Sequence, residues 1–364
     1  MFREYYKNRR VFVTGHTGFK GSWLIAWLLK LGSEVCGYSL GIPTNPSNFK
    51  ILGLERDITH IKGDICDRSK LQKAILKFKP DIVFHLAAQS LVRWSYNNPA
   101  ETFETNAIGT MNILECIRQS PSVEAGVIIT TDKCYRNLGR PHDYKENDKL
   151  GGEDPYSSSK GCAELIVYSY FKSFFKNGPR IASARAGNVI GGGDWAEDRI
   201  VPDAVRAWSD KKPLIIRNPR ATRPWQHVLE PLSGYLWLGA ELCKENSPVV
   251  GEAFNFGPTT SANHSVQQLI SHMAEYWPGT KWELGKVGMF KEKEALFLQL
   301  CCNKARRLLN WKAILPFENM TTMTIEWYQN YYKHGKTGML DFTNRQIDYY
   351  SSMARKSRLP WVSL

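Results

Sequence analysis

The sequence has no uninterrupted apolar stretch of the roughly 20 residues that a membrane-spanning helix needs. Its first ten residues are basic and aromatic, and no apolar segment follows them in the manner of a secretory signal. These absences argue against an integral membrane protein and against an exported one. We therefore expect a soluble, cytoplasmic protein without a membrane partner.

Metal-ligand and disulfide patterns are also missing. The eight cysteines are scattered without CxxC spacing and mostly stand in apolar surroundings, and none of the eight histidines falls in an HExxH arrangement. Internal repeats and low-complexity tracts are absent too, which excludes solenoid architectures. We expect reduced thiols, as is typical of cytosolic enzymes, and neither zinc nor another metal cofactor.

Charge of one sign is in excess, because 48 lysines and arginines stand against 35 acidic residues and give a formal charge of +13. Such an excess fits a nucleic-acid partner, an anionic membrane, an anionic small substrate or an ordinary solvated surface. Basic residues cluster at the first ten positions and at Arg355–Arg358, but no basic block interleaved with aromatics lies between them. We expect no nucleic-acid partner, and nucleic-acid binding is the weaker alternative.

What is present is a regular alternation of short β-branched runs with longer helical patterns. The runs that we expect to be strands are Val11–Thr14, Glu34–Tyr38, Ile58–Ile61, Ile82–His85, Gly126–Thr130 and Ile181–Ala184. Such βαβ alternation predicts an α/β fold, with a doubly wound parallel sheet covered by helices on both faces. The chain of 364 residues is long enough for this unit plus a smaller lobe.

The pattern loosens after Arg185 into loops rich in glycine, proline and tryptophan, which is typical of a substrate lobe. We place the boundary near Gly187. Residues 1–187 then form a nucleotide-binding domain of the Rossmann type, and residues 188–364 form mainly a smaller C-terminal substrate-binding lobe. We also expect the chain to return to the first domain near 222–250.

A glycine array stands between the first predicted strand and the helix predicted over Phe19–Leu31. Gly15, Gly18 and Gly21 follow a GxxGxxG spacing, which differs from the commoner GxGxxG. Bare backbone at this place lets a pyrophosphate approach the helix N-terminus. A plain turn is the alternative, but the strand-turn-helix context predicts a bound dinucleotide.

The choice between NAD and NADP is left open by the second predicted strand. It ends in Tyr38–Gly41 without the acid that would bind the ribose of NAD. Asp64, after the third strand, is a candidate acceptor for the adenine amino group, with an ordinary turn aspartate as the alternative. The residues that we expect to contact the cofactor are Gly15, Thr17, Gly18, Phe19, Gly21, Asp64, Ile65, Leu86, Ala87, Ala88, Tyr156 and Lys160.

Tyr156 and Lys160 are four residues apart behind Pro155, so their side chains project from one face of a helix. A nearby ammonium lowers the pKa of a tyrosine, which lets the phenolate act as a base toward a hydroxyl while a nicotinamide takes hydride from the same carbon. Two other pairs share this spacing and are expected by chance: Tyr168 with Lys172, and Tyr332 with Lys336.

Context separates the first pair from the other two. A predicted strand runs into Thr130–Lys133 about 25 residues before Tyr156 and would bring these groups beside the helix start. Adjacent Asp132 and Lys133 indicate a second proton-transfer step, which a simple reductase does not need and a dehydratase does. A surface turn is the alternative for this pair.

Six motifs in order resemble the CDP-glucose 4,6-dehydratases, a family of extended short-chain dehydrogenases/reductases. They run from about residue 8 to about residue 333 and read TGHTGFKGSWL, HLAAQSLVR, TTDKCY, DPYSSSK, ARAGNVIGGGDW and RPWQHVLEPL. The resemblance implies a bound NAD that is reduced and regenerated in each cycle. It also implies conversion of CDP-glucose to CDP-4-keto-6-deoxyglucose and water.

The resemblance also implies roles for single residues. Tyr156 and Lys160 assist oxidation at C4, and Thr131 holds the hydroxyl. Lys133 then removes the C5 proton, Asp132 protonates the departing C6 hydroxyl, and hydride returns to C6. Many related dehydratases have an aspartate-glutamate pair at this place, so the lysine points to the CDP-sugar branch.

The substrate residues implied by the resemblance lie in loops. Guanidinium forks match a diphosphate well, although ordinary loop anchoring is an alternative for each residue. Those in the nucleotide-sugar loops are Asn188, Arg199, Arg223 and His227. Gln89 and Arg93 are candidates to line the sugar pocket, while Asn106 matches a family position that has no evident chemical role.

Two departures from the family pattern leave open questions. Gly41 stands where relatives often carry a polar or acidic residue, which leaves the cofactor preference open. Lys293 precedes Glu294 where a histidine is usual, which leaves open how that loop closes over substrate.

Alternatives to this function share part of the same machinery. A 4-epimerase or 4-keto reductase would use Tyr156 and Lys160 without Asp132 and Lys133, and a non-enzymatic nucleotide-binding protein would keep only the glycine array. By analogy with the fold, we expect a homodimer or homotetramer built through Pro99–Arg118 and Tyr156–Phe175. Such sugars commonly supply cell-surface polysaccharides, including lipopolysaccharide O-antigen.

Overall fold

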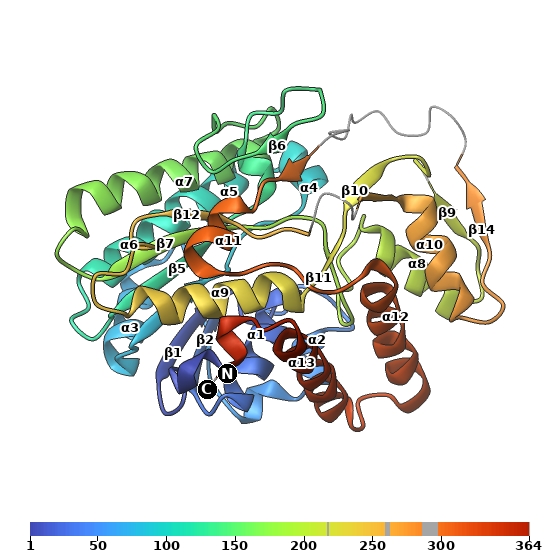
Figure 1. Ribbon diagram of the computed structural model, residues 1–364, viewed down its shortest axis with the longest axis horizontal. Helices are drawn as coiled ribbons and strands as arrows, with labels where there is room; N and C mark the ends of the chain where they lie inside the picture. Colours follow the sequence, from blue (N-terminus) through green and yellow to red (C-terminus); the bar gives the residue numbers. More distant parts are fainter. Residues whose placement is uncertain (217, 259–262, 286–297, 364) are drawn as a thin grey trace.

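A seven-stranded parallel sheet forms the centre of the molecule (Figure 1). The computed structural model describes residues 1–216, 218–258, 263–285 and 298–363. The strand order is β3-β2-β1-β4-β5-β7-β12, and every neighbouring pair is parallel. The strands are β1 (Arg10–Thr14), β2 (Glu34–Ser39), β3 (Thr59–Lys62), β4 (Ile82–His85), β5 (Ala125–Ile129), β7 (Arg180–Arg185) and β12 (Ala253–Asn255). The order in which strands are added to the sheet reverses between β1 and β4, because β2 and β3 lie on one side of β1 and β4 lies on the other. Doubly wound folds bind nucleotides at this place.

The two faces of this sheet have separate apolar cores because successive side chains of a strand point to opposite sides. Val11 and Val13 pack with Trp23 in one core, whereas Phe12 packs with Leu71 in the other. The helices α1 (Phe19–Lys30) and α9 (Leu229–Leu242) belong to the first core, and α13 (Met339–Lys356) packs outside α1. The helices of the second core are α3 (Arg68–Phe78), α6 (Gly109–Arg118) and α7 (Pro155–Phe174). The predicted doubly wound fold is thus confirmed.

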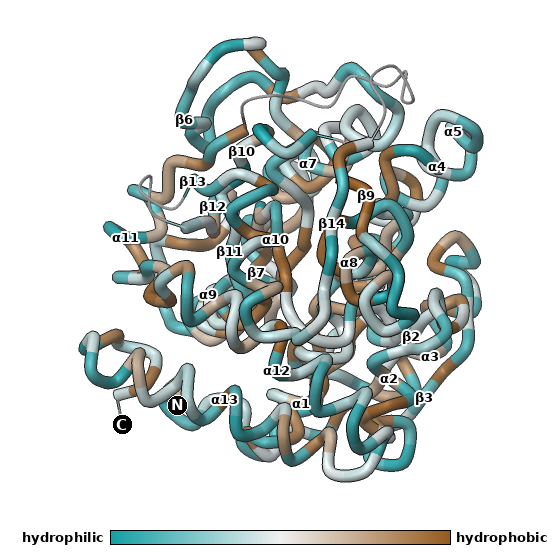
Figure 2. The backbone as a smooth tube through the Cα atoms, turned by 90° about the vertical axis from the view of Figure 1, so that its right-hand side faces the viewer, coloured by the Kyte–Doolittle hydropathy of each residue, from teal (hydrophilic) through white to brown (hydrophobic). Residues whose placement is uncertain are grey.

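A smaller lobe lies beside the carboxyl ends of the strands. Figure 2 faces this lobe and shows β9 and β14 side by side, with α8 and α10 next to them. Its elements are α8 (Ile200–Ser209), β9 (Leu214–Ile216), β10 (Thr222–Pro224), β13 (Asn263–Ser265), α10 (Val266–Glu275), β14 (Trp282–Leu284) and α12 (Phe317–His334). Two short parallel pairs connect the lobe to the sheet: β8 (Val189–Ile190) with β11 (Gln226–His227), and β6 (Asp143–Tyr144) with β15 (Gln299–Leu300).

Short helices complete the described chain. They are a 3-10 turn at Phe2–Glu4, α2 (Asn48–Ile51), a 3-10 turn at Leu54–Arg56, α4 (Val92–Asn97), α5 (Pro99–Phe103), a π-helix at Glu104–Ile108, a 3-10 turn at Asp132–Cys134, α11 (Asn303–Leu309) and a 3-10 turn at Pro360–Val362. The chain leaves the sheet after β7 and returns with α9 and β12. The strand β12 therefore extends the returning segment beyond the predicted 222–250. The division of roles between 1–187 and 188–364 stays a prediction.

The glycine run Gly191–Gly193 lets the lobe approach the sheet domain. A Cβ atom on Gly192 would lie 2.0 Å from Cγ of Trp327, and one on Gly193 would lie 2.5 Å from Cγ of Asn48. The Trp23 indole of α1 donates a hydrogen bond of 2.8 Å to the carbonyl oxygen of Gly192. The absence of side chains at this run therefore lets α12 pack directly against the loop that follows β8.

Replacing Gly192 by alanine should lower the free energy of unfolding by about 1–3 kcal/mol, because the added methyl group overlaps the buried Trp327 ring. Denaturant unfolding followed by circular dichroism measures this change. Gly41→Ala is the control, since no atom lies within 4 Å of its added Cβ. Equal stability of the two variants would contradict this account of the glycine run.

Candidate active site

The predicted phosphate-binding turn is built by close backbone packing. Gly15 has a left-handed φ of 71°, and a Cβ there would lie 2.6 Å from the backbone nitrogen of Ala87. A Cβ on Gly21 would lie 2.3 Å from the carbonyl oxygen of Gly15. Gly18 is the N-cap of α1. The turn therefore lies directly against the end of β4, where residues 86–88 follow the strand.

The other predicted cofactor residues near this turn differ in their burial and in their hydrogen bonds. Thr17 is buried and donates a hydrogen bond of 2.6 Å to the carbonyl oxygen of Gly41, which ties the turn to the segment after β2. Asp64 is exposed, and its carboxylate accepts a hydrogen bond of 2.8 Å from the backbone N–H of Cys66. Ile65 is buried under α6, while Phe19 is half-buried. All of them lie at the carboxyl ends of β1, β2 and β3 or on the turn itself.

The long helix α7 presents Tyr156 and Lys160 on one face, as predicted. Asp154 caps its N-terminus by accepting a hydrogen bond of 2.9 Å from the backbone N–H of Ser157. The backbone N–H of Tyr156 donates to the buried hydroxyl of Ser95, 3.2 Å away. Both side chains of the pair are almost fully buried. The helix start is therefore fixed from two sides.

The turn after β5 places its polar groups against the same helix. The Thr131 hydroxyl donates to Oδ1 of Asp132 at 2.9 Å and also hydrogen-bonds the Tyr156 side chain. Asn188 Nδ2 lies 3.3 Å from the other oxygen of Asp132, Oδ2. A Cβ on Gly187 would lie 2.0 Å from that same Oδ2 atom. The structure thus brings Thr131, Asp132, Tyr156 and Asn188 together.

Burial dominates the protonation of these groups. It raises the pKa of Tyr156 to about 12, although the Thr131 hydrogen bond and the Arg199 charge act in the opposite direction. It lowers the pKa of Lys160 to about 8. The expected lowering of the Tyr156 pKa by an ammonium is therefore not found, because loss of solvation dominates.

Asp132 differs from a solvent-exposed turn aspartate in that it is buried and has a raised pKa. Burial raises its pKa, and the nearby charge of Lys133 and the Thr131 hydrogen bond only partly oppose this. A carboxyl group that retains its proton is suited to donate it to a leaving hydroxyl. Lys133 is half-buried beside it.

Two predicted substrate arginines link the loops on either side of Tyr156. Arg199 forms an ion pair of 2.8 Å with Asp194 and donates to the Ser90 hydroxyl at 3.3 Å. Arg93 forms an ion pair of 2.8 Å with Asp198. These contacts connect the loop after β4 with the loop after β8.

Three other predicted substrate residues are placed differently. Gln89 donates a hydrogen bond of 2.9 Å to the Thr102 hydroxyl, so its side chain is held against α5. Arg223 is half-buried, donates to the Thr222 carbonyl oxygen at 3.0 Å and adds its charge to the surroundings of Asp132. His227 is fully buried, and its ring packs edge-on against Trp23. Their contact with substrate stays a prediction.

Asn106, which had no evident role in the sequence, proves to be a structural link. Its side chain donates to the Gln89 carbonyl oxygen and to the Ser159 hydroxyl, each at 2.9 Å, and accepts from the Gln89 backbone N–H at 2.9 Å. It therefore fixes the loop after β4 to α7. The predicted decoy Tyr168 is 61% exposed, and the Lys172 ammonium lies over its ring, 5.5 Å from the centroid.

Sequence reasoning missed Lys20, in the first turn of α1. Burial lowers the pKa of its ammonium to about 8, and the charges of Arg199, Asp132 and Lys160 also act on it. The signal that was available is a lysine inside the glycine motif, between Gly18 and Gly21.

Some expectations fall outside what the structure describes. Lys293 and Glu294 lie outside the described residues. Within 1–216, 218–258, 263–285 and 298–363, no group of three or more His, Cys, Asp or Glu residues is arranged to hold a metal ion. In the same ranges no helix has the length and apolar character to cross a membrane.

Comparison with known proteins gives one relative that is similar along almost its whole length. CDP-glucose 4,6-dehydratase of Salmonella typhimurium is 44% identical over 361 residues, which cover 97% of this chain and 99% of the relative. A probable dTDP-glucose 4,6-dehydratase of Sinorhizobium fredii is 27% identical and covers 88% of this chain and 92% of its own length. The family model described as GDP-mannose 4,6 dehydratase matches residues 12–324.

Solved structures agree in fold. The dTDP-glucose 4,6-dehydratase of Bacillus anthracis, in complex with NAD, has a TM-score of 0.73 and 20% identity, and the match covers 90% of this chain and 98% of that one. UDP-glucose 4-epimerase of Thermotoga maritima, with UDP-glucose, has a TM-score of 0.75 and 21% identity, covering 88% and 99%. From the family model and the Salmonella relative, the chain belongs to the GDP-mannose 4,6 dehydratase family of extended short-chain dehydrogenases/reductases.

Proposed function

We propose that the protein is a CDP-glucose 4,6-dehydratase, a hydro-lyase that converts CDP-D-glucose to CDP-4-dehydro-6-deoxy-D-glucose and water. One observation carries the proposal: the turn after β5 sets a buried carboxyl group, Asp132, and an adjacent lysine, Lys133, beside Tyr156 and Lys160. Four such groups are enough for two separate proton transfers on one sugar. The 44% identity with the Salmonella CDP-glucose 4,6-dehydratase supports the choice of nucleotide.

The cofactor that we propose is NAD. The turn of Gly15, Gly18 and Gly21 fits a pyrophosphate, because its side-chain-free backbone meets the start of α1 at the point where the strand order reverses. The NAD bound to the dehydratase of Bacillus anthracis supports NAD over NADP. Bound NAD would supply the acceptor for hydride from C4 of the sugar and the donor of that hydride to C6. Tyr156 and Lys160 would hold the nicotinamide half, and Asp64 and Ile65 would hold the adenine half.

The first proton transfer belongs to Tyr156. It takes the C4 hydroxyl proton in its phenolate form, and the Lys160 charge must stabilise that form against the burial that raises the pKa of Tyr156 to about 12. Thr131 would hold the same hydroxyl. The resulting C4 ketone makes the neighbouring C5 proton acidic.

The second transfer belongs to the turn after β5. Lys133 removes the C5 proton, and Asp132 protonates the C6 hydroxyl, so that the C6–O bond breaks and water leaves. After hydride reaches C6, a proton returns to C5. The proton taken by Tyr156 and the proton given by Asp132 balance through solvent. The raised pKa of Asp132 supports its role as the acid.

The diphosphate of the substrate would be held by arginines. Arg199 and Arg223 both act on the surroundings of the catalytic groups, Arg199 on Tyr156 and Arg223 on Asp132. One guanidinium group can donate two parallel hydrogen bonds to two oxygens of a phosphate. Asn188, whose side chain lies 3.3 Å from Asp132, would contact the sugar. Gln89, Arg93 and His227 remain further candidates for substrate contact.

Incubation of the protein and NAD with CDP-, dTDP-, UDP- and GDP-glucose separately tests the proposal. We expect a 4-keto-6-deoxy product from CDP-glucose, far slower turnover of the other three, and no net NADH. Inversion at C4 would identify a 4-epimerase instead, and net NADH would identify a dehydrogenase. Absence of any reaction with NAD bound would favour a non-enzymatic nucleotide-binding protein.

We further propose that two copies of the chain associate through α6 and α7, as a homodimer or within a homotetramer. Large apolar side chains on and beside these helices are solvent-exposed in the single chain. Leu165 is 57% exposed and Ile108 is 44% exposed, and Phe103 and Tyr168 also face outward. Exposed apolar patches of this kind mark interaction surfaces, and two helices from each copy would cover one another.

Leu165→Asp should therefore convert the oligomer to a smaller species, because it places a charge in the centre of the buried interface. Sedimentation velocity measures the change. Leu284→Asp is the matched control, since Leu284 is 63% exposed on β14 in the other lobe. A wild-type monomer, or a Leu165→Asp variant with the wild-type sedimentation coefficient, would contradict this interface.

The proposed reaction also suggests where the protein acts. Nucleotide sugars and NAD are cytoplasmic metabolites, so we propose a cytoplasmic enzyme. A 4-keto-6-deoxy sugar nucleotide is a precursor of deoxysugars, and we propose that its product supplies cell-surface polysaccharide such as lipopolysaccharide O-antigen. A deletion strain that keeps an unchanged polysaccharide composition would contradict this assignment.

A further inference from the structure

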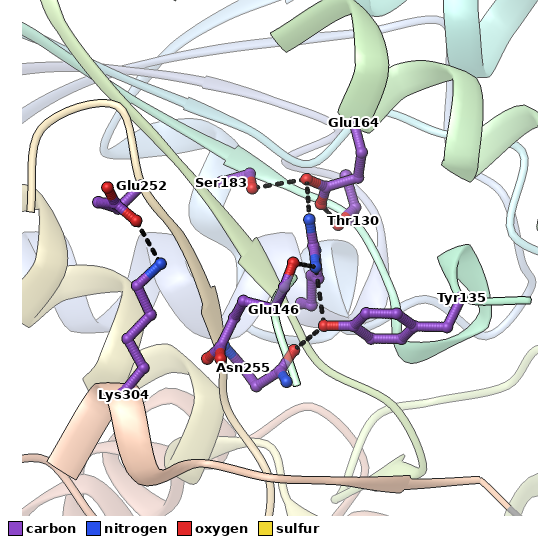
Figure 3. Close-up of polar contacts among 9 residues, drawn as sticks. Thr130, Tyr135, Glu146, Glu164, Ser183, Glu252, Asn255 and Lys304 are labelled. Carbon is purple, nitrogen blue, oxygen red and sulfur yellow. Dashed lines mark hydrogen bonds and ion pairs between the residues drawn. The ribbon is translucent and has the colours of Figure 1, made fainter. Parts of the chain in front are cut away.

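A buried ion pair lies behind the catalytic groups. Glu164 of α7 and Arg185 at the end of β7 meet at 2.8 Å, and both side chains are at most 4% exposed. The Glu164 carboxylate also accepts hydrogen bonds from the hydroxyl groups of Ser183, at 2.8 Å, and of Thr130. Figure 3 shows Glu164, Ser183 and Thr130 gathered around this pair.

One end of the network is continuous with the catalytic helix and the catalytic turn. Tyr156, Lys160 and Glu164 are spaced four residues apart, so they share one face of α7. Thr130, the hydroxyl partner of Glu164, immediately precedes Thr131 in the chain. A displacement of the Glu164 carboxylate would therefore move both elements that carry the proposed acid and base groups.

The other end holds the far side of the same turn. The Arg185 guanidinium donates to the Tyr135 hydroxyl at 2.7 Å, and that hydroxyl donates to Oδ1 of Asn255 at 2.7 Å. Asn255 in turn donates to the backbone carbonyl oxygens of Tyr144, at 2.8 Å, and Cys301, at 3.2 Å. The residues from Thr130 to Tyr135 are thus held at both ends by one charge pair (Figure 3).

We propose that Glu164 is a positioning residue for both proton transfers, kept ionised by Arg185: its charge holds Lys160 protonated, and its hydrogen bond to Thr130 holds the catalytic turn against α7. This inference rests on the proposed function for its kinetic readout. Neither residue of the pair touches the positions assigned to substrate.

The effect of the Glu164 charge on Lys160 depends on the groups that face the Lys160 ammonium. Burial lowers its pKa to about 8, and the Glu164 carboxylate is the largest opposing influence, with Cys134 of the catalytic turn next. The charge of Lys160 acts in turn on His85 of β4 and on Lys20 of α1. Burial alone would raise the pKa of Glu164, but the Arg185 charge and its hydrogen bonds hold it below the usual range.

Glu164→Gln keeps the shape of the side chain and removes the charge. Glu164 lies one helical turn from Lys160 on α7 and is the largest influence that opposes the lowering of its pKa, so its removal should move the alkaline limb of the pH profile of kcat about one unit toward lower pH. We expect kcat itself to fall about 10–100-fold through misplacement of the turn. The KM for CDP-glucose should stay within about threefold, because the pair does not contact substrate.

Two further variants test the charge effect on Lys160 and the hydrogen bond to Thr130 separately. They also distinguish these effects from a loss of folding. Glu164→Leu combined with Arg185→Met leaves no unpaired buried charge, so we expect it to fold even if Glu164→Gln, which leaves Arg185 unpaired, is too unstable to assay. In this double variant the alkaline limb of the pH profile of kcat should still move toward lower pH. Thr130→Val keeps both charges, and should lower kcat without moving the pH profile.

Glu252→Gln is the matched control, since Glu252 forms an exposed ion pair with Lys304 nearby (Figure 3). The pH dependence of NAD affinity, followed by tryptophan fluorescence, needs no turnover and reports the Lys160 titration separately. A wild-type protein inactive on CDP-glucose would contradict the proposed function. A folded Glu164 variant with wild-type kcat and with wild-type pH dependence of both kcat and NAD binding would overturn the inference.

Discussion

Replacing Tyr156 by phenylalanine should lower kcat by about 10²–10⁴-fold, to the point where no keto sugar is detected, because it removes the group that takes the C4 hydroxyl proton. The ring remains, so the buried site at the start of α7 keeps its packing. The assay is the formation of the 4-keto product from CDP-glucose, followed by NMR. NAD binding should persist, since the glycine turn is unchanged.

Tyr168→Phe is the matched control for this variant. Tyr168 has the same spacing to a lysine, but it lies exposed on the outer face of α7 and away from the turn after β5. Its substitution removes only one hydroxyl group from the proposed interface between copies, far from the catalytic groups, and should leave kcat within about twofold of wild type. If Tyr156→Phe retained turnover, the first proton transfer would have to be assigned to another group.

Lys133→Ala should slow elimination more than oxidation at C4. The first step depends on Tyr156 and Lys160, which the variant leaves intact, whereas the C5 proton loses its base. Reduced nicotinamide should therefore accumulate within a single turnover, and its absorbance in a stopped-flow experiment measures this directly. Dehydration should fall by about 10²–10⁴-fold, the contribution typical of a positioned base.

The control for this variant is Lys73→Ala, an exposed lysine on α3. It should show neither NADH accumulation nor a loss of rate. Full dehydration by Lys133→Ala would show that the base assignment is wrong. Loss of both steps without NADH would instead indicate that Lys133 helps bind the substrate.

The strands of the sheet could be predicted from sequence because most are short runs of buried, mainly apolar residues that alternate with helical patterns, although β3 is largely exposed. All six predicted strands are present, and no predicted strand end differs from the observed one by more than one residue. The strand β12 was missed because Ala253–Asn255 is only three residues long and is recognisable by its pairing with β7 alone. The amphipathic spacing of Ile347, Tyr350 and Ala354 on α13 was a usable signal in the last thirty residues.

The site was predictable where chemistry is local in the chain. Asp132 follows Thr131 directly, and Tyr156 is one helical turn from Lys160, so their spacing together with the predicted strand before them indicated these residues. The contact of Asp132 with Gly187 and the pairing of Arg185 with Glu164 join residues far apart in sequence. Such contacts depend on how the strands are ordered in the sheet, which spacing does not encode.

Charges were the least predictable feature. The sequence predicted an ammonium that lowers the Tyr156 pKa, but burial raises it to about 12. Burial is a property of the whole packed site, including the loops that carry Arg199 and Asp194. The ion pair of Arg93 with Asp198 likewise joins two loops that are far apart in the sequence.

The central claim is that one site oxidises C4, removes water across C5 and C6, and returns the same hydride to C6. Incubation of the protein and NAD with CDP-glucose in deuterium oxide, followed by NMR, tests it most directly. The account predicts a 4-keto-6-deoxy product with deuterium at C5, no deuterium gained at C6 and no net NADH. Deuterium at C6, or a product that retains the C6 hydroxyl, would contradict it.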